Sequence, residues 1–288
     1  MRSIRIDRPL DPALLRILEA VDHVVADYGI DCFVTGAMAR DILLTHVFGI
    51  DTGRATRDVD FAIAVASWDQ FNLFKARLVS GGSFTASDKL VQRLYYRDEA
   101  RKFEYPIDLV PFGGVEQIPH TFAWPPELDV MMNVAGYEDA LKTAEHVQVN
   151  QDLIIRVASL PSLAMLKLFA WKDRGLTDSK DAVDLLTIMR RYSDAGNQDR
   201  LYSEAFDILE SARYDPHLAS ACLLGADIAR RVSKSTCRQL IDMLSDTTLV
   251  DRLVLHLARS LKDQEDSQTV ADALIGQFKT GLGIGPSR

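Results

Sequence analysis

Three aspartates carry the strongest chemical signal in this sequence. Asp58 and Asp60 lie in the strand-like run RDVDFAI (57–63), where alternate side chains share one face. Asp108 lies in a second strand-like run, YPIDLV (105–110), in which Pro106 indicates a strand start or an edge. If the two strands are neighbours, three carboxylates converge, and they repel one another unless a cation sits between them. The pattern predicts a site for two Mg²⁺ ions that clamp an in-line phosphoryl transfer.

A turn made of small residues lies upstream of the Asp-x-Asp pair. A strand from Phe33 is expected to end at Thr35, followed by Gly36-Ala37 and a helix that carries Arg40. Small residues at such a turn let backbone N–H groups approach a phosphate, helped by the positive end of the following helix. Each of these features is common by itself in soluble proteins, but their conjunction in this order is much less common.

The ordered segments resemble the polymerase β-type nucleotidyltransferase superfamily, whose pattern is a Gly-Gly/Ser turn, Asp-x-Asp/Glu and a distant third Asp. Residues 36–41 (GAMARD) also resemble the Gly-Gly-x-x-Arg-Asp segment of the tRNA CCA-adding and poly(A) polymerase branch. Ala37 departs from the usual second Gly or Ser, and no Arg-rich base-selecting motif follows, so CCA addition is not expected. The resemblance implies two Mg²⁺ ligands at Asp58 and Asp60, a third that also activates the attacking hydroxyl at Asp108, and NTP phosphate contacts at Gly36, Ala37 and Arg40.

A second informative stretch is LAMLKLFAWKDR (163–174), which predicts a helix that is apolar nearly all round. Lys167 is its one charge before Lys172. A buried ammonium must either reach solvent or meet an anion such as a triphosphate, and periodicity leaves both alternatives open. Trp171 and Arg174 follow on the same face as Lys167, which predicts a cationic and aromatic stripe. We expect NTP phosphates to be bound here by Lys167, Lys172 and Arg174.

The next predicted helix begins near Asp178 and carries two further acidic residues. Asp181 close to a helix start is equally explained by the helix dipole. However, Lys167 followed by Lys180-Asp181-x-x-Asp184 resembles the downstream motifs of AbiEii-type toxins, the nucleotidyltransferase half of type IV toxin–antitoxin systems. The resemblance covers about residues 33–192, and the helices after Asn197 match no named family. It implies supporting roles for Asp181 and Asp184, RNA or tRNA as the acceptor, and a cognate antitoxin as a partner. Arg57, beside two carboxylates, is expected to balance their charge.

The composition and net charge exclude several classes of protein. The chain has 288 residues, of which 47% are hydrophobic and 26% charged, as in a soluble globular protein. The net charge of −8 excludes a general basic coat, so any nucleic-acid contact would be a local patch. The three cysteines and six histidines show no zinc or disulfide spacing. No signal peptide and no apolar run of about 18 residues is present. We therefore expect a cytoplasmic protein that contacts no membrane.

The order of elements predicts an α/β (α+β) fold. A helix capped by Asp11 runs to Gly29, a capping box at Ser67 opens a helix to about residue 79, and strands at 89–97 and 103–112 flank a hairpin loop at 97–102. They form a small mixed sheet with flanking helices. After a Pro-rich loop at 124–126 and short strands near residues 147 and 154, helices are expected at about 161–174, 178–192, 198–213, 216–231, 235–245, 247–262 and 268–279.

These elements divide into a nucleotidyltransferase catalytic domain (1–125), a connecting segment with short strands (126–160), a helical domain that completes the nucleotide site (161–280) and a flexible tail (281–288). The predicted reaction transfers a nucleoside monophosphate from an NTP to an acceptor hydroxyl. We expect the acceptor to be RNA or tRNA and the protein to act as a toxin. Two alternatives stay open. A small hydroxylated molecule, as in antibiotic-modifying enzymes, is mildly favoured by the acidic balance. A catalytically inactive nucleotide-binding protein is disfavoured, because a chain released from catalysis would gain stability by losing clustered like charges.

Overall fold

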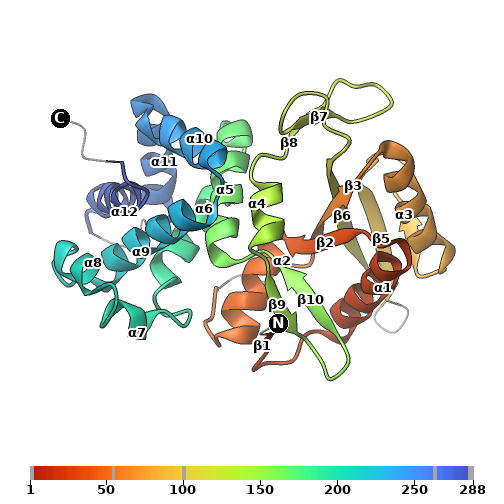
Figure 1. Ribbon diagram of the computed structural model, residues 1–288, viewed down its shortest axis with the longest axis horizontal. Coiled ribbons are helices and arrows are strands. Elements are labelled where there is room, and N and C mark those ends of the chain that lie inside the picture. The colour runs from red at the N-terminus through yellow and green to blue at the C-terminus, as the bar shows by residue number, and fades with distance from the viewer. Residues whose placement is uncertain (1–2, 54–55, 99–101, 262–264, 285–288) are drawn as a thin grey trace. The chain divides into compact units, whose positions relative to one another are not determined.

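The computed structural model describes residues 3–53, 56–98, 102–261 and 265–284. The chain divides into two compact units, Met1–Ser159 and Leu160–Arg288, coloured red to green and green to blue in Figure 1. The first unit is a mixed sheet with helices, and the described part of the second is helical. The prediction of an α/β fold with a helical C-terminal part is confirmed. Two predicted features, the centre of the 97–102 loop and the end of the 281–288 tail, lie outside the described residues.

An eight-stranded sheet forms the core of the first unit. Its strands are adjacent in the order β1 (Ile4–Arg5), β9 (Glu145–Gln148), β10 (Ile154–Val157), β2 (Asp31–Thr35), β3 (Val59–Val65), β6 (Phe103–Gly113), β5 (Arg93–Asp98) and β4 (Phe84–Ala86). The segment 126–160, which was expected to connect two domains, contributes β9 and β10 to this sheet. In the centre, β3 is antiparallel to β2 and parallel to β6. The strands that carry Asp60 and Asp108 are therefore neighbours.

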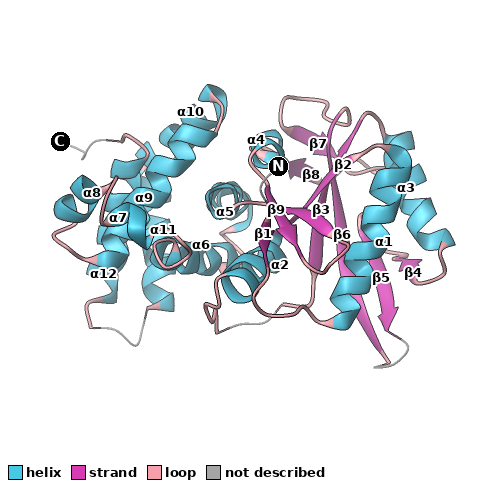
Figure 2. Cartoon of the chain, turned by 60° about the horizontal axis from the view of Figure 1, so that its bottom comes forward, coloured by secondary structure: helices cyan, strands magenta, loops and turns pink. Residues whose placement is uncertain are grey.

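Helices cover both faces of this sheet. On one face, α1 (Pro12–Tyr28) packs against α3 (Trp68–Ser80), as Figure 2 shows. Asp11 caps α1 by accepting a hydrogen bond from the Ala13 N–H, and Gly29 ends the helix in the left-handed conformation. On the other face, α4 (Tyr137–Lys142) contacts β2 and β6, where the Tyr137 ring meets Phe33 and Phe112. Asp60 and Asp108 share this second face, because Asp60 is in register with Thr35, two residues from Phe33.

Pro106 lies inside β6 and does not start it, because the two neighbours of β6 begin at different points. Pro106 is opposite Tyr95 of β5, whereas the pairing with β3 begins one residue later, at Ile107. Proline has no N–H to donate and is tolerated where only one neighbour is paired. The predicted Pro-rich loop is likewise part of a hairpin formed by β7 (Thr121–Ala123) and β8 (Met131–Asn133).

The helices of the second unit follow the predicted pattern with one exception. The predicted helix 198–213 is two short helices, α7 (Gln198–Leu201) and α8 (Phe206–Ser211), because the N–H groups of Ser203 and Ala205 both donate to the Arg200 carbonyl and end α7. The other elements are α5 (Leu160–Arg174), α6 (Lys180–Arg191), α9 (Pro216–Arg231), α10 (Lys234–Ser245), α11 (Thr247–Ser260) and α12 (Ser267–Gly281). Within this unit α9 and α12 pack against each other along their length.

A buried carboxylate ties α7 to α9. Asp227 accepts two hydrogen bonds from the Arg200 guanidinium, at 2.8 and 2.9 Å, and a third from the hydroxyl of Tyr192. Burial alone would raise the pKa of Asp227, but these three hydrogen bonds outweigh burial and lower it. Asp227 is therefore a charged group in the core that depends on its partners.

We expect Asp227→Ala to lower the free energy of unfolding of the protein by about 3 kcal/mol, because Arg200 and Tyr192 lose a buried partner. Asp207→Ala, which removes an exposed carboxylate on the neighbouring α8, should change it by less than about 0.5 kcal/mol. Urea unfolding followed by circular dichroism measures both values. Equal stability of the two variants would contradict the structural role of Asp227.

Candidate functional site

Asp60 and Asp108 lie directly opposite each other across the β3–β6 ladder. Neighbouring strands are about 4.8 Å apart, so residues in register on one face place their side chains side by side. Both side chains are partly exposed, and Asp58 precedes β3 in an exposed position. The strand pairing thus brings the second and third predicted carboxylates together at one end of the sheet.

Gly36 makes room for the Asp60 carboxylate. The chain leaves β2 at Thr35 and enters α2 (Gly36–Asp41), which continues as a π-helical segment, Ile42–Val47. Gly36 has φ +68°, and a Cβ added there would lie 1.9 Å from Asp60 Oδ2. Glycine is therefore required both by the left-handed backbone and by the close approach of Asp60. Ala37 has no such constraint, which is why the Ala at this position is compatible with the turn.

Arg93 is a residue of this site that the sequence reasoning missed. It lies on β5 opposite Asp108, and its Nε and Nη2 donate to the two carboxylate oxygens at 2.8 and 2.6 Å. The hydrogen bonds to Asp108 are the main reason why the pKa of Arg93 is raised, and Asp58 adds to the effect. The signal was available in principle. The predicted hairpin between the strands at 89–97 and 103–112 pairs Arg93 with Asp108 if its register is known.

Oxygen donors such as these aspartates are the ligands that Mg²⁺ prefers, so the chemistry of the set fits this ion. The guanidinium of Arg93 shows in addition that the carboxylates attract a cation. In the described side-chain arrangement, Asp108 turns both oxygens to Arg93. Within the part of the chain that the structure describes, no three His, Cys, Asp or Glu side chains are gathered closely enough to hold a metal ion.

Arg40 is buried and has only 2% of its surface exposed. Its Nε and Nη2 donate to Asp41 Oδ1 at 2.9 and 2.6 Å. Asp41 in turn accepts hydrogen bonds from the Thr52 hydroxyl at 3.4 Å and from the Thr56 N–H at 3.3 Å. The two hydrogen bonds from Arg40 hold its guanidinium against its neighbour in sequence, and the expected phosphate contact of Arg40 stays a prediction. The pair anchors the segment that leads into Asp58.

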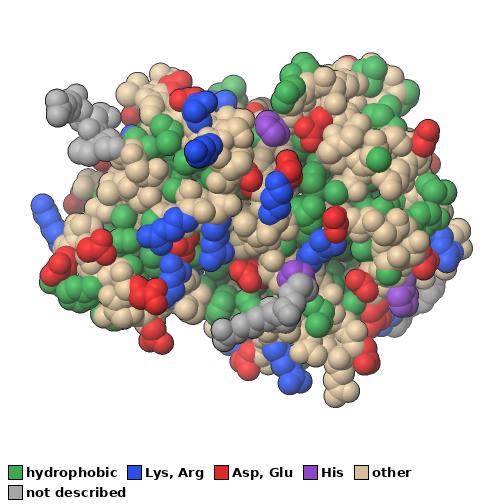
Figure 3. Space-filling view, in the orientation of Figure 1, with side chains coloured by type: hydrophobic (Ala, Val, Ile, Leu, Met, Phe, Trp, Pro, Cys, Tyr) green, Lys and Arg blue, Asp and Glu red, His purple; other side chains and the backbone are tan. Residues whose placement is uncertain are grey.

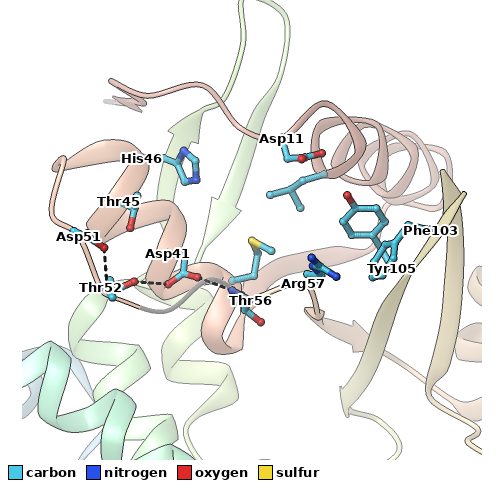
Figure 4. A pocket seen from close by; sticks show the side chains of 13 residues that line it. Asp11, Asp41, Thr45, His46, Asp51, Thr52, Thr56, Arg57, Phe103 and Tyr105 are labelled. Atoms are coloured by element: carbon cyan, nitrogen blue, oxygen red, sulfur yellow. Dashed lines mark hydrogen bonds between the residues drawn. The ribbon is translucent and has the colours of Figure 1, made fainter. Parts of the chain in front are cut away.

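Arg57 packs over the ring of Phe103, 4.6 Å from its centroid, and its expected role in balancing the carboxylates stays a prediction. Figure 4 shows it facing a cavity of about 790 Å³ within the first unit. Phe103 and Tyr105 alternate with Asp108 along β6 and so belong to the opposite face of the sheet from the carboxylates. The rest of the wall comes from α1, α2 and the segment after them, including Asp11, Asp41, Asp51 and His46.

Lys167 meets carboxylates of its own unit. Its Nζ lies 3.0 Å from Asp181 Oδ1 and 2.6 Å from Asp184 Oδ2 on α6, and its side chain is 11% exposed. Burial opposes its charge, but Asp184 and Asp181 outweigh burial, so the pKa of Lys167 is raised and the side chain stays cationic. Of the two alternatives left open for this lysine, the structure shows an anion and not escape to solvent.

The other residues predicted on α5 differ in exposure. Arg174 forms two hydrogen bonds with Asp181, at 2.7 and 3.1 Å, although most of its side chain is exposed, and Lys172 is exposed. Trp171 is buried, with its Nε1 donating to His256 Nδ1 at 3.0 Å. The predicted aromatic stripe is therefore wrong, because Trp171 faces the core of the second unit.

Within the described residues, no helix combines the length and apolar character that crossing a membrane requires.

The chain matches the protein-family model described as "Nucleotidyl transferase AbiEii toxin, Type IV TA system" over residues 16–270. No curated protein matches the sequence. Solved structures with a similar arrangement include an antigenic nucleotidyltransferase-like protein from Paracoccidioides brasiliensis, with 15% identity and a TM-score of 0.43, covering 70% of this chain and 93% of that one.

Two further structures are the antibiotic-resistance factor ANT(2'')-Ia and a CCA-adding enzyme with ATP. The first has 8% identity and a TM-score of 0.39, and the match covers 71% of this chain and 99% of that one. The second has 13% identity and a TM-score of 0.26, and the match covers 95% of this chain and 83% of that one.

We expect Gly36→Ala to reduce the rate of nucleotidyl transfer by about a hundredfold or more, because the new Cβ displaces the Asp60 carboxylate. Gly29→Ala is the matched control. Its φ of +60° imposes a similar backbone cost of about 1 kcal/mol, but nothing lies within 4 Å of the added Cβ. Transfer is measured with α-labelled NTP, and stability by urea unfolding. Unchanged transfer in Gly36→Ala would show that the position of Asp60 does not matter.

We expect Lys167→Met to lower the free energy of unfolding by about 3 kcal/mol in the absence of nucleotide, because Asp184 and Asp181 lose a buried cation. Lys172→Met, on the same helix but exposed, should change it by less than about 0.5 kcal/mol. Urea unfolding of the helical signal distinguishes the two. A Lys167→Met protein as stable as the Lys172→Met protein would mean that the ion pairs contribute nothing to the fold.

Proposed function

Because the chain belongs to the AbiEii nucleotidyl transferase family, whose model matches residues 16–270, we propose that it transfers a nucleoside monophosphate from an NTP to a hydroxyl group of RNA in a reaction that requires Mg²⁺. The observation that carries the proposal is the in-register pair of Asp60 and Asp108 on neighbouring strands, with Gly36 fitted against Asp60. Like charges placed side by side cost stability, so we take their presence as a sign that they serve a function.

Asp58, Asp60 and Asp108 would hold the Mg²⁺ ions. When bound, such ions neutralise the phosphate that is attacked and orient the entering and leaving oxygens. Asp108 is also proposed to accept the proton of the attacking hydroxyl, since its side chain is partly exposed and lies in register with Asp60 on the same face of the sheet. Pyrophosphate is the product that leaves. The chain does no covalent chemistry, so positioning and charge supply most of the rate.

The cations of the chain are proposed to serve in two ways. Arg93 holds Asp108 in place through its two hydrogen bonds, and a guanidinium of this geometry is equally suited to a phosphate. Lys167, oriented by Asp181 and Asp184, is proposed as a phosphate contact, with added positive charge from the exposed Lys172 and Arg174. Gly36 and Ala37 leave backbone N–H groups accessible for the same purpose.

RNA is the proposed acceptor, because the family description names a toxin and the motif resemblance implies RNA as its target. A cognate antitoxin is accordingly a proposed partner, and the cytoplasm is the proposed location. A second candidate acceptor is a small cationic molecule with hydroxyl groups, which the net charge of −8 mildly favours over RNA.

Four labelling reactions test the proposal. In each, one α-labelled NTP is incubated with the protein, Mg²⁺ and total RNA. We expect one NTP to label RNA, and we expect Asp60→Asn to reduce labelling about a thousandfold because it removes a metal ligand. Asp69→Asn, an exposed aspartate on α3, should label RNA like the wild type.

A parallel reaction contains an aminoglycoside in place of RNA. Label in the aminoglycoside and none in RNA would support the second acceptor and contradict the first. No transfer to either, or equal transfer by wild type and Asp60→Asn, would discard the proposed chemistry. Growth arrest on expression that disappears with Asp60→Asn is the expected sign of a toxin.

A further inference from the structure

The β7–β8 hairpin exposes large apolar side chains. Among the described residues, twelve large hydrophobic side chains are exposed, and four of them belong to this segment. Ile118, Leu128, Val130 and Met131 have exposed fractions of 61, 50, 57 and 54%; we call these four residues the hairpin patch. Figure 3 shows hydrophobic side chains in green along the edge of the molecule where β7 and β8 lie in Figure 1. Apolar surface gathered in this way marks interaction sites more often than scattered single side chains do.

The base of the hairpin is firmly packed. Phe122 of β7 is fully buried, and its ring lies 4.8 Å from that of Trp124 and 5.4 Å from that of Trp68 on α3, centroid to centroid. Trp124 also meets Phe71 on α3, at 6.3 Å. Aromatic pairs of this kind add stability beyond the area they bury. The exposure of the hairpin patch is therefore a fixed feature of the fold, since the strands below it cannot easily turn these side chains inward.

Leu128 is unfavourable for the isolated chain in two respects, its backbone conformation and its exposed apolar side chain. It has φ +60°, the left-handed conformation that glycine and asparagine adopt at less cost. Its N–H donates to the Trp124 carbonyl at 3.0 Å and so closes the end of the hairpin. This geometry does not need leucine, and half of the side chain is exposed to solvent. A contact outside the chain would explain why an apolar side chain is displayed at this point.

The charge around the hairpin patch is negative. The sequence from Phe103 to Leu141 contains no Lys or Arg, and within the hairpin Glu127 and Asp129 are exposed on either side of Leu128. RNA and anionic lipid would be repelled by these carboxylates. A protein surface that offers apolar side chains bordered by Lys or Arg would bury the patch and pair the two carboxylates.

We propose that the hairpin patch is a docking surface for a partner protein that presents apolar side chains flanked by lysine or arginine. Covering the exposed parts of Val130 and Met131 supplies much of the affinity, because apolar surface removed from water favours association. Glu127 and Asp129 favour basic partners over acidic ones. This inference does not depend on the reaction proposed above.

A pair of synthetic amphipathic peptides tests the surface. Both carry a leucine face, and the other face carries lysine in one peptide and glutamate in the other. By fluorescence anisotropy we expect the lysine peptide to bind the full chain and the glutamate peptide not to bind. The double variant Val130→Ser/Met131→Ser should weaken binding by about tenfold or more, and Glu127→Gln/Asp129→Asn by a few fold with loss of salt dependence. Leu73→Ser, which removes an exposed leucine from α3, is the matched control and should bind like the wild type.

Four results would overturn the proposal. Equal binding of the lysine peptide by all variants would place the contact elsewhere, and equal binding of both peptides would remove the charge argument. Direct binding of labelled single-stranded RNA to the chain, if Val130→Ser/Met131→Ser abolishes it, would make the patch a nucleic-acid surface. A stable dimer in light scattering that Val130→Ser/Met131→Ser dissociates would mean that a second copy of the chain covers the patch. Nucleotidyl transfer should be unchanged in the double variant, because the patch touches none of the carboxylates.

Discussion

The β3–β6 register, which sets Asp60 and Asp108 directly opposite each other, is the constraint on which the candidate site depends. The ladder fixes both residues on one face of the sheet, where two carboxylates repel each other unless each has a partner or a shared cation. The chain meets this constraint locally. Gly36 leaves space for Asp60, and Arg93, on the other side of β6, neutralises Asp108 with a bidentate pair. Residues from three strands and one turn are thus committed to two charges that a purely structural sheet would replace with apolar side chains.

The same rule governs the buried charges elsewhere in the chain. Lys167 lies between Asp181 and Asp184, Arg40 pairs with Asp41, and Asp227 is held by Arg200 and Tyr192. In each case the charged group is stable in the core because its partner supplies the interactions that water would otherwise provide. The Arg40–Asp41 pair extends this support to β3, because Asp41 also holds the segment that leads into Asp58.

The sequence was most informative where local pattern and chain order agree. The strand that ends at Thr35, the turn at Gly36, the Asp-x-Asp strand and the capped helix at Ser67 could all be predicted, because each depends on neighbouring residues. The contacts of Arg93, Arg57 and Lys167 could not, because they depend on the strand register and on the packing of helices that are far apart in sequence. For Pro106, a strand start and an edge could not be distinguished without knowing where its neighbours pair, and the split of 198–213 was missed because the turns between α7 and α8 were not separated from helix. The β7–β8 hairpin is short and rich in proline, so its pattern is that of a loop.

Anomalous diffraction from crystals of the wild-type chain grown with Mn²⁺ and a non-hydrolysable NTP tests the central claim most directly. Mn²⁺ binds the same oxygen donors as Mg²⁺ and reports its position without ambiguity. We predict anomalous density within ligating distance of both Asp60 and Asp108, with the Arg93 guanidinium moved from Asp108 to a phosphate. Density remote from these carboxylates, or none while Arg93 keeps both hydrogen bonds to Asp108 and NTP is bound, would contradict the account.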